Sequence, residues 1–220
     1  MNNNITEVVF ILDRSGSMGG LVQDTIGGFN SLLDKQKKEA GTALVTTVLF
    51  DDKIETLHDR KNIADIPHIT EDDYFVRGCT ALLDAIGQTI DHIKMIHRYA
   101  RPEDVPARTL FIITTDGMEN ASHRYTSDRV KQLIQHEKEK YGWEFLFLGA
   151  NIDAVETAAH FGISREYAVD YMPDSAGTEK NFEAMCKAVT HMRTCAAPLG
   201  ASWKEDIEAD FAARRPGRKR

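Results

Sequence analysis

The sequence predicts an α/β fold, in which a doubly wound, mostly parallel, Rossmann-like sheet is flanked by helices and carries one antiparallel edge strand. Three observations support this. Short apolar runs rich in β-branched residues recur along the chain, stretches with helical periodicity separate them, and the runs are apolar throughout. Strands of that kind are buried on both faces, as in a parallel sheet covered by helices on each side.

The first half of the chain supplies three strands and one helix. The acidic pair Asp51-Asp52 reads as a tight turn, so the strand after it pairs antiparallel with the strand before it. Gly27 and Gly28 weaken the helix and indicate close packing on the sheet. The expected elements are a strand over Val8–Leu12, a helix from Met18 to near Gly41, and strands over Thr42–Phe50 and Lys53–Leu57.

The second half continues the alternation. The expected elements are a helix carrying Leu82 to Ile96, a strand over Thr109–Thr115, a helix over Ser127–Tyr141, a strand over Glu144–Leu148, a helix over Asp153–Phe161, a strand over Tyr167–Tyr171 and a helix over Thr178–Thr194. Pro198 to Gly200 interrupts this pattern. We therefore expect one domain over residues 1–197 and a C-terminal extension over 198–220, with a disordered basic end.

The charge of the chain is distributed unevenly. The formal net charge is −7, and the last seven residues, from Arg214, carry five positive charges, so the rest of the chain stands at −12. An acidic body argues against broad binding to nucleic acid or to anionic membranes, because such binding needs a basic surface that displaces counterions. Nucleic acid is therefore an unlikely partner except through the basic tail.

The expected cellular compartment follows from sequence features that the chain lacks. The N-terminus has no basic segment followed by a long apolar stretch, and the apolar runs are far shorter than the roughly 20 residues of a membrane helix. The three cysteines, Cys79, Cys186 and Cys195, form no dense disulfide framework. These features favour a cytoplasmic protein without a membrane partner.

Hydroxyl and carboxylate side chains follow two of the predicted strands. Asp13, Ser15 and Ser17 come directly after the first strand, Asp116 follows the strand over Thr109–Thr115, and Thr80 stands just before a helix. In open parallel sheets, ligands bind beyond the carboxyl ends of the strands, where the winding direction reverses. We therefore expect these five residues to converge.

Oxygen ligands of this kind suit a hard divalent cation. Mg²⁺ is the first expectation, with Mn²⁺ or Ca²⁺ as alternatives. Neutral serine and threonine ligands leave the charge of the ion poorly compensated. A partner protein that presents an Asp or Glu would therefore complete the shell.

The segments Asp13–Met18, Gly78–Leu82 and Thr115–Gly117 together resemble the von Willebrand factor A (vWA) domain and its metal-ion-dependent adhesion site (MIDAS). The resemblance covers roughly residues 5–195. It implies a vWA fold in which Ser15, Ser17 and Thr80 ligate the ion directly, while Asp13 and Asp116 act directly or through water. It also implies a protein interaction module, similar to stand-alone intracellular bacterial members that act beside ATPases, kinases or phosphatases in stress-response or metal-related assemblies.

Capping is the competing structural interpretation of these residues. Serine, threonine and aspartate commonly cap helices or form turns, which would explain each of the five positions singly. The set of five in this order is what capping does not explain. Asp51-Asp52 and the acidic run Glu71–Asp73 read as a hairpin turn and a solvated helix start in preference to a second metal site.

The histidines and cysteines do not form a second candidate site. At about 100° per residue, His191 lies about 140° and Cys195 about 180° around the helix from Cys186, so the three cannot meet on one face. His92 and His97 fail in the same way. Structural or surface roles are the better interpretation of these side chains.

Three other functions fit the sequence less well. A magnesium-dependent phosphotransferase or hydrolase of the haloacid-dehalogenase type also places an aspartate after its first strand, but it needs a second aspartate where this chain has Ser15, so its general acid is missing. A serine hydrolase lacks both the required motif and an identifiable base. A secreted adhesin is disfavoured by the absence of a signal peptide. The sequence therefore predicts a binding module and not an enzyme.

Overall fold

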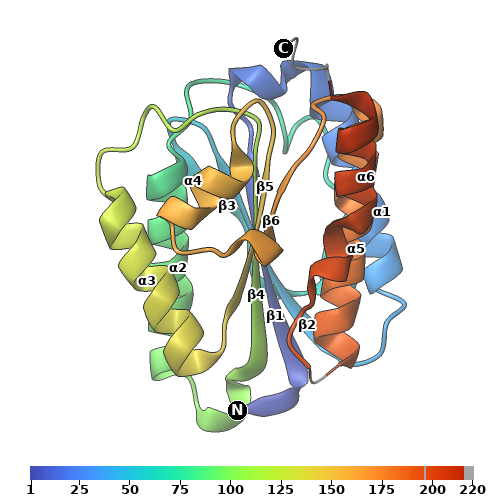
Figure 1. Cartoon of the computed structure of the whole chain (residues 1–220). Coiled ribbons are helices and arrows are strands. Elements are labelled where there is room, and N and C mark those ends of the chain that lie inside the picture. Colours follow the sequence, from blue (N-terminus) through green and yellow to red (C-terminus); the bar gives the residue numbers. More distant parts are fainter. Residues whose placement is uncertain (196, 216–220) are drawn as a thin grey trace.

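Six strands form a single sheet in the computed structural model, which describes residues 1–195 and 197–215 (Figure 1). Their order across the sheet is β3-β2-β1-β4-β5-β6. All neighbouring strands run parallel except β2 and β3, which are antiparallel at one edge. The predicted fold class is therefore confirmed. The strands are β1 Asn2–Asp13, β2 Thr42–Phe50, β3 Ile54–Asn62, β4 Pro106–Thr115, β5 Glu144–Gly149 and β6 Ala168–Asp170.

Strand β1 lies at the centre of the sheet. It pairs with β2 from Ile5 to Asp13 on one side and with β4 on the other. The chain first winds outward from β1 to β2 and β3, and then crosses back to build β4, β5 and β6 on the opposite side. The reversal of winding therefore falls between β1 and β4, where ligands of such sheets bind.

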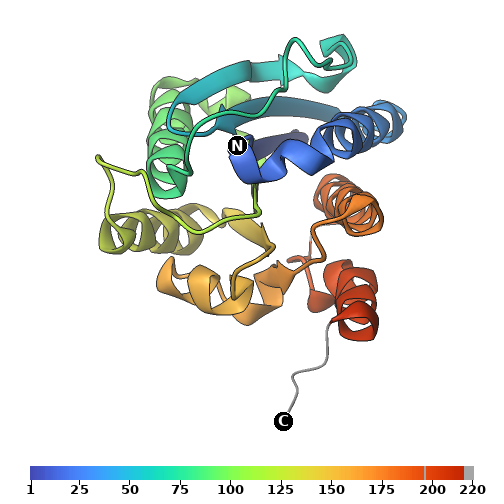
Figure 2. The same cartoon turned by 90° about the horizontal axis from the view of Figure 1, so that it is seen from above.

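Helices cover both faces of the sheet, as the view from above shows (Figure 2). One apolar cluster joins α1 and α5 to their face of the sheet, and a second joins α2, α3 and α4 to the other. No helix of the described residues has the length and apolar composition needed to cross a bilayer. The helices are α1 Val22–Gln36, α2 Leu82–Tyr99, α3 Ser127–Tyr141, α4 Ala154–His160, α5 Ser175–Thr194 and α6 Glu205–Arg214.

The ends of α1 differ from the sequence-based expectation. A 3-10 helix over Gly16–Leu21 precedes it, and the α-helix ends at Gln36 instead of near Gly41. The buried side chain of Arg193, on α5, explains the early end, because it donates to the carbonyls of Gln36, Glu39, Ala40 and Gly41. A long-range contact thus satisfies carbonyl groups that a continued helix would have used.

The segment after Pro198 packs on the domain. Trp203 and Ile207 are buried in the same apolar cluster as α5. The indole of Trp203 donates to the carbonyl of Glu166 at 3.0 Å, and Lys204 donates to the carbonyl of Ala168 at 2.8 Å. The C-terminal extension therefore lies against the edge of the sheet at β6. Arg214 of the basic tail pairs with Asp174 and Asp210, and the part of the tail over 216–220 lies outside the described residues.

The two glycines of α1 differ in their surroundings. A Cβ added to Gly28 would lie 2.2 Å from the ring of Phe182 on α5, whereas a Cβ added to Gly27 would have nothing within 4 Å. The close packing expected from this pair is therefore between α1 and α5, not with the sheet. Only Gly28 provides it.

We expect the substitutions Gly28→Ala and Gly27→Ala to change stability in opposite directions. Gly28→Ala should lower the free energy of unfolding by about 1–3 kcal/mol, because the new methyl group overpacks the contact with Phe182. Gly27→Ala should raise it by about 0.5–1 kcal/mol, since alanine is the better residue in an open helix position. Urea denaturation of both variants measures the difference, and equal effects would contradict the packing described.

Candidate metal centre

The strands β1 and β4 end at the upper edge of the sheet in Figure 1, and the five predicted site residues belong to the segments that follow these strands or precede α2. Asp13 is the last residue of β1, and Asp116 directly follows β4. Thr80 stands two residues before α2 begins. Because β1 and β4 are neighbours in register, their carboxyl ends bring the two aspartates together.

Asp13 is held from two sides. One carboxylate oxygen accepts a hydrogen bond from the backbone N–H of Ser15 at 2.7 Å, and the other accepts from the hydroxyl of Thr115 at 2.7 Å. The residue is only 1% exposed, and this burial raises the pKa of its carboxyl although the hydrogen bonds from Thr115 and Ser15 oppose the shift. Asp13 is thus a fixed, buried carboxylate.

The serine hydroxyls connect Asp13's loop to Asp116. The Oγ atoms of Ser15 and Ser17 are 3.1 Å apart, and the hydroxyl of Ser17 donates to Asp116. Burial raises the pKa of Asp116, the hydrogen bond from Ser17 lowers it, and the charge of Asp13 raises it further. The two aspartates therefore interact as like charges in a poorly solvated place.

Thr80 reaches the same point from a different loop. A Cβ placed on Gly117 would lie 3.5 Å from Ser17 Oγ and 3.6 Å from Thr80 Oγ1. Both hydroxyls thus border the small space beside Gly117. The structure therefore brings all five predicted residues together at one point.

Capping does not account for these side chains. Ser15 occupies the N-cap position of the 3-10 helix but makes no capping hydrogen bond, and the N-cap of α2 is Ala81 and not Thr80. The side-chain hydroxyls of Ser15 and Thr80 are therefore not used for helix capping and can act as ligands at the site.

The donor set fits a hard divalent cation. It consists of three hydroxyl and two carboxylate groups, the oxygen ligands that Mg²⁺, Mn²⁺ and Ca²⁺ take. Asp13 and Asp116 are 1% and 3% exposed, and neither has a basic partner within ion-pair distance among the described residues. A cation would compensate their charge, and the exposed position of Ser17 leaves the site open to solvent on that side.

Comparisons with known proteins agree with this geometry at the level of the fold. The mussel byssus protein PTMP1, in a structure with a zinc-occupied MIDAS motif, matches with a TM-score of 0.59 at 18% identity over 84% of this chain. The ArnB paralog VWA2 from Sulfolobus acidocaldarius matches with a TM-score of 0.51 at 18% identity over 84%. This chain has a vWA-like α/β fold.

A pilus adhesin, SpaC from Lactobacillus rhamnosus GG, matches the same vWA-like fold with a TM-score of 0.63 at 11% identity over 84% of this chain. The chain spans less than half of each of these three proteins, with 46% of PTMP1, 45% of VWA2 and 30% of SpaC. No family model matches the sequence, and no curated protein matches it significantly.

A buried ion-pair network lies beside the candidate metal site. Arg14, which is fully buried, donates to Asp51 at 3.0 Å and to Glu55 at 2.8 Å. Arg77 binds the same oxygen of Asp51 at 2.6 Å. Burial opposes ionisation of Asp51. Its pKa is nevertheless lowered, because it accepts hydrogen bonds from Arg77 and from the backbone N–H of Lys53 and lies near the positive charge of Arg14.

Backbone hydrogen bonds join the same loops. The N–H of Arg77 donates to the carbonyl of Arg14 at 2.9 Å, and the N–H of Gly16 donates to that of Gly78 at 3.3 Å. Gly78 has a φ of 65°, and a Cβ there would meet Asp52 at 2.1 Å. The turn after β2 therefore clamps together the loop that carries Ser15 and Ser17 and the loop that carries Thr80.

Asp84 fixes the third loop, which follows β4. Its carboxylate accepts hydrogen bonds from the backbone N–H groups of His123, Arg124 and Tyr125 at 2.8–2.9 Å. In the same loop, the side chain of Asn120 accepts from the N–H of Thr80, and its own N–H donates to the Thr80 carbonyl. Asp84 and Asn120 thereby tie the loop of Asp116 to the start of α2.

Sequence reasoning missed these supporting residues. Asp51 forms part of the predicted hairpin turn, but no sequence pattern indicates that it is buried or that two arginines bind it. The one available signal was Arg14, a basic residue directly after a buried strand, which requires an acidic partner if it is buried. Glu71–Asp73 lies in a turn and not in a helix start.

The rejected histidines and cysteines lie elsewhere. His92 pairs with Asp59 at 2.9 Å and His97 with Glu7 at 2.6 Å, and His191 contacts the carbonyl of Ala197 at 3.0 Å. Within the described residues, no group of three or more His, Cys, Asp or Glu side chains has the arrangement of a metal site. The hydroxyl-containing centre is the candidate that remains.

We expect Asp51→Ala to lower the free energy of unfolding by about 3–5 kcal/mol, because it leaves the buried guanidinium of Arg14 without its fully buried partner. The matched control is Asp52→Ala, at the neighbouring exposed position, which should change stability by no more than about 0.5 kcal/mol. Thermal and urea unfolding measure both. Similar losses in the two variants would contradict the clamp.

The hydrogen-bonded carboxylate of Asp84 should make the stability of the fold depend on pH. Burial opposes ionisation of this carboxyl, but the three backbone hydrogen bonds outweigh burial and lower its pKa. Since the folded-state pKa is the lower one, the contribution is complete above the unfolded pKa of about 4 and is lost as pH falls through the folded value. Urea midpoints between about pH 2 and 6 should therefore fall less steeply on acidification in Asp84→Asn than in the wild type. Asp65→Asn, at an exposed position, should keep the wild-type slope.

Proposed function

We propose that this chain is a metal-dependent protein interaction module. Ser15, Ser17 and Thr80 would hold a divalent cation, and Asp13 and Asp116 would bind it directly or through water. The observation that carries the proposal is the convergence of these hydroxyls on two buried aspartates that have no basic partner among residues 1–195 and 197–215. Mg²⁺ is the expected ion, with Mn²⁺ or Ca²⁺ as alternatives.

The residues of the site have separable roles. The hydroxyls supply neutral oxygens, so a bound cation retains net positive charge and attracts an acidic group. Asp13 holds the backbone of Ser15 and the hydroxyl of Thr115, and Asp116 holds the hydroxyl of Ser17. Exposure of Ser17 and its neighbour Gly16 lets a partner approach. An Asp or Glu side chain of a partner protein would complete the coordination shell.

The names of two structurally similar proteins support this proposal. One is a matrix protein with a zinc-occupied MIDAS motif, and the other is a pilus adhesin. At such low sequence identity the likeness supports only a shared fold. The partner of this chain is therefore proposed from its own residues. We further propose a cytoplasmic location, on the composition of the sequence, and a bacterial stress-response or ATPase-associated assembly, on the resemblance to stand-alone vWA proteins alone.

We also propose that the site binds without catalysing a reaction. Both carboxylate oxygens of Asp13 accept hydrogen bonds, which disfavours Asp13 as a nucleophile. The position two residues later is Ser15, a hydroxyl that cannot serve as the carboxylic general acid of a phosphotransferase. Phosphatase activity that is present in the wild type and lost in Asp13→Ala would overturn this part of the proposal.

Calorimetric titration of metal-stripped protein tests the metal site directly. Wild-type protein should bind Mg²⁺ or Mn²⁺, and Ser17→Ala should weaken binding by at least about tenfold, because it removes one hydroxyl ligand. Ser31→Ala, at an exposed position on α1, serves as the matched control and should bind as the wild type does. Equal affinity of all three proteins, or no binding by any, would refute the proposed site.

The partner is tested by capture from a lysate of the source cells. Proteins retained by wild-type protein should be lost with EDTA, lost with Ser17→Ala, and kept with Ser31→Ala. Replacement of individual acidic residues in a captured partner should then locate the carboxylate that meets the ion. A partner indifferent to EDTA would show that the interaction uses another surface.

A further inference from the structure

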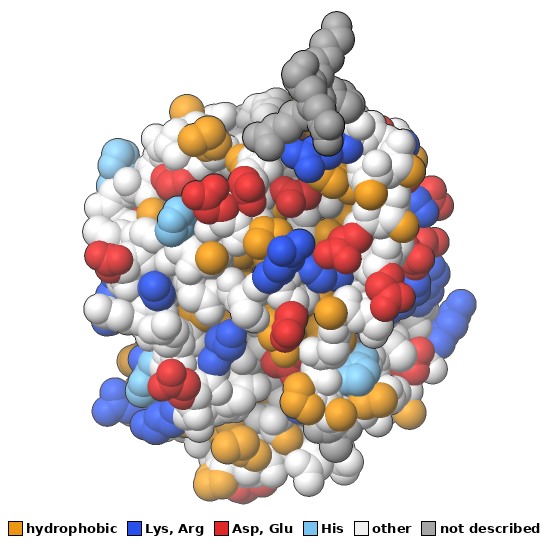
Figure 3. Space-filling view, in the orientation of Figure 1, with side chains coloured by type: hydrophobic (Ala, Val, Ile, Leu, Met, Phe, Trp, Pro, Cys, Tyr) orange, Lys and Arg blue, Asp and Glu red, His pale blue; other side chains and the backbone are white. Residues whose placement is uncertain are grey.

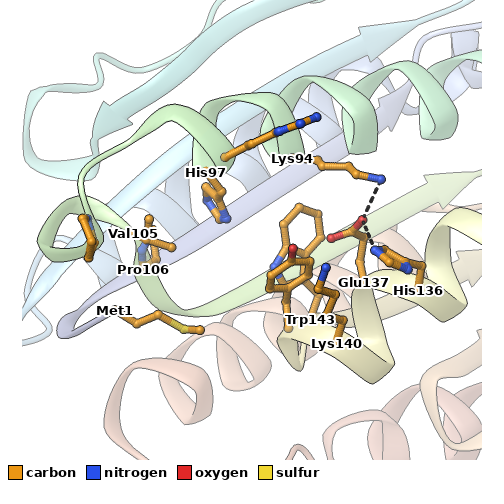
Figure 4. A pocket seen from close by; sticks show the side chains of 12 residues that line it. Met1, Lys94, His97, Val105, Pro106, His136, Glu137, Lys140 and Trp143 are labelled. Atoms are coloured by element: carbon orange, nitrogen blue, oxygen red, sulfur yellow. Dashed lines mark ion pairs between the residues drawn. The ribbon is translucent and has the colours of Figure 1, made fainter.

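A cavity of about 540 Å³ lies at the end of the sheet where β4 and β5 begin, opposite the end that carries the metal site (Figure 4). It is bordered by the last turns of α2 and α3 and by the chain entering β4 and β5. Since α2 begins beside Thr80 and its 18 residues rise by roughly 27 Å, the cavity and the metal site are separate. Its volume is within the range of about 300–1,000 Å³ that is usual for small-molecule sites.

The wall of the cavity includes a firm apolar surface. Val105 and Pro106 contribute from the start of β4, and Trp143 contributes from the start of β5. The Trp143 ring is 4% exposed and stacks on Phe111, with ring centroids 5.3 Å apart. His97 packs edge-on against the same ring at 5.3 Å, so only the small exposed part of Trp143 is in a fixed position to contact a ligand.

The basic side chains of the cavity divide into two groups. Lys94 pairs with Glu137 at 3.2 Å, and His97 pairs with Glu7 at 2.6 Å. Arg98 and Lys140 also line the cavity, but no carboxylate among the described residues lies within ion-pair distance of either. Basic side chains also gather at the lower left of the surface in Figure 3, over the lower end of α3. Arg98 lies over the ring of Tyr99 and Lys140 over the ring of Tyr141, so two positive charges without a carboxylate partner among the described residues border the cavity of a protein whose net charge is negative.

The one carboxylate in the wall does not suit a cationic ligand. Both oxygens of Glu137 are buried, and the ammonium group of Lys94 lies against one of them. Basic residues at the ends of α2 and α3 also stabilise the helix dipoles, and that role needs no ligand. It does not explain a cavity of this volume with an apolar wall.

We propose that this cavity binds a small organic anion with a ring-sized apolar body, of the class of the aromatic carboxylates. The apolar body contacts Val105, Pro106 and the exposed part of Trp143, and the positive charges of Lys140 and Arg98 attract the carboxylate. Binding here depends on no metal, so it stands or falls independently of the proposed function.

The test is calorimetric titration of the full chain with 2-naphthoate, with neutral 2-naphthalenemethanol as the matched ligand. We expect saturable binding of naphthoate and about tenfold weaker binding of the alcohol, since charge-assisted hydrogen bonds to the carboxylate are lost. EDTA should change neither affinity. A dissociation constant for naphthoate above about 1 mM, equal affinity for the two ligands, or loss of binding with EDTA would overturn the proposal.

Variants and an internal probe locate the binding. Lys140→Gln and Arg98→Gln should each weaken naphthoate binding about fivefold to tenfold. Lys138→Gln, on the same helix but outside the lining of the cavity, should have no effect. In NMR spectra, the indole N–H signal of Trp143 should shift on titration while that of Trp203, the second tryptophan, stays unchanged. The reverse pattern, or equal weakening by Lys138→Gln, would refute this site.

Discussion

Two buried side chains of opposite charge, Asp13 and Arg14, follow one another where β1 ends, and the loops of the upper edge are organised around them. Thr115 at the end of β4 binds the carboxylate of Asp13, and the hydroxyl of Tyr74 donates to its carbonyl at 2.5 Å. Asp51 after β2 binds the guanidinium of Arg14. The turn after β2, the segment that precedes α2 and the end of β4 thus each contact one of these two residues.

The two charges are compensated unequally. Arg14 has two acidic partners, Asp51 and Glu55, and its positive charge is therefore balanced within the protein. Among the described residues, Asp13 accepts hydrogen bonds only from neutral donors, and the charge it meets in the site is that of the second acid, Asp116. Burial of a charge without a counterion is unfavourable, and burial of two like charges is more so. The fold therefore concentrates uncompensated negative charge at one point, beside three hydroxyl groups, where a cation would restore balance.

Much of this arrangement could be predicted from the sequence. The strands were recognised because their residues are buried on both faces, and the five site residues were recognised because they follow strand ends or precede a helix. The supporting residues could not be recognised in this way. Asp51, Tyr74 and Asp84 act through contacts with segments far away in sequence, and nothing in their neighbours distinguishes a buried aspartate from one in a solvated turn.

The boundaries of elements were less predictable for a related reason. The end of α1 at Gln36 depends on Arg193, which is 157 residues later in the chain and donates to carbonyls at the helix terminus. The packing of Trp203 on the domain depends in the same way on the carbonyl of Glu166. Hydrophobic periodicity reports which face of a helix is buried, but it does not report which distant side chain satisfies the groups at its end.

The rigidity of the loops should affect the affinity of the proposed metal site. The ligand-bearing segments are joined by backbone hydrogen bonds, from Gly16 to Gly78 and from Asn120 to Thr80, so little chain entropy would be lost when an ion binds. Affinity should then depend on two separable quantities. Residues that contact the ion set the charge that is compensated, whereas Asp51 and Asp84 set the positions of the loops. Because the clamp at Asp51 also balances Arg14, the geometry of the site and the stability of the fold depend on the same buried ion pair.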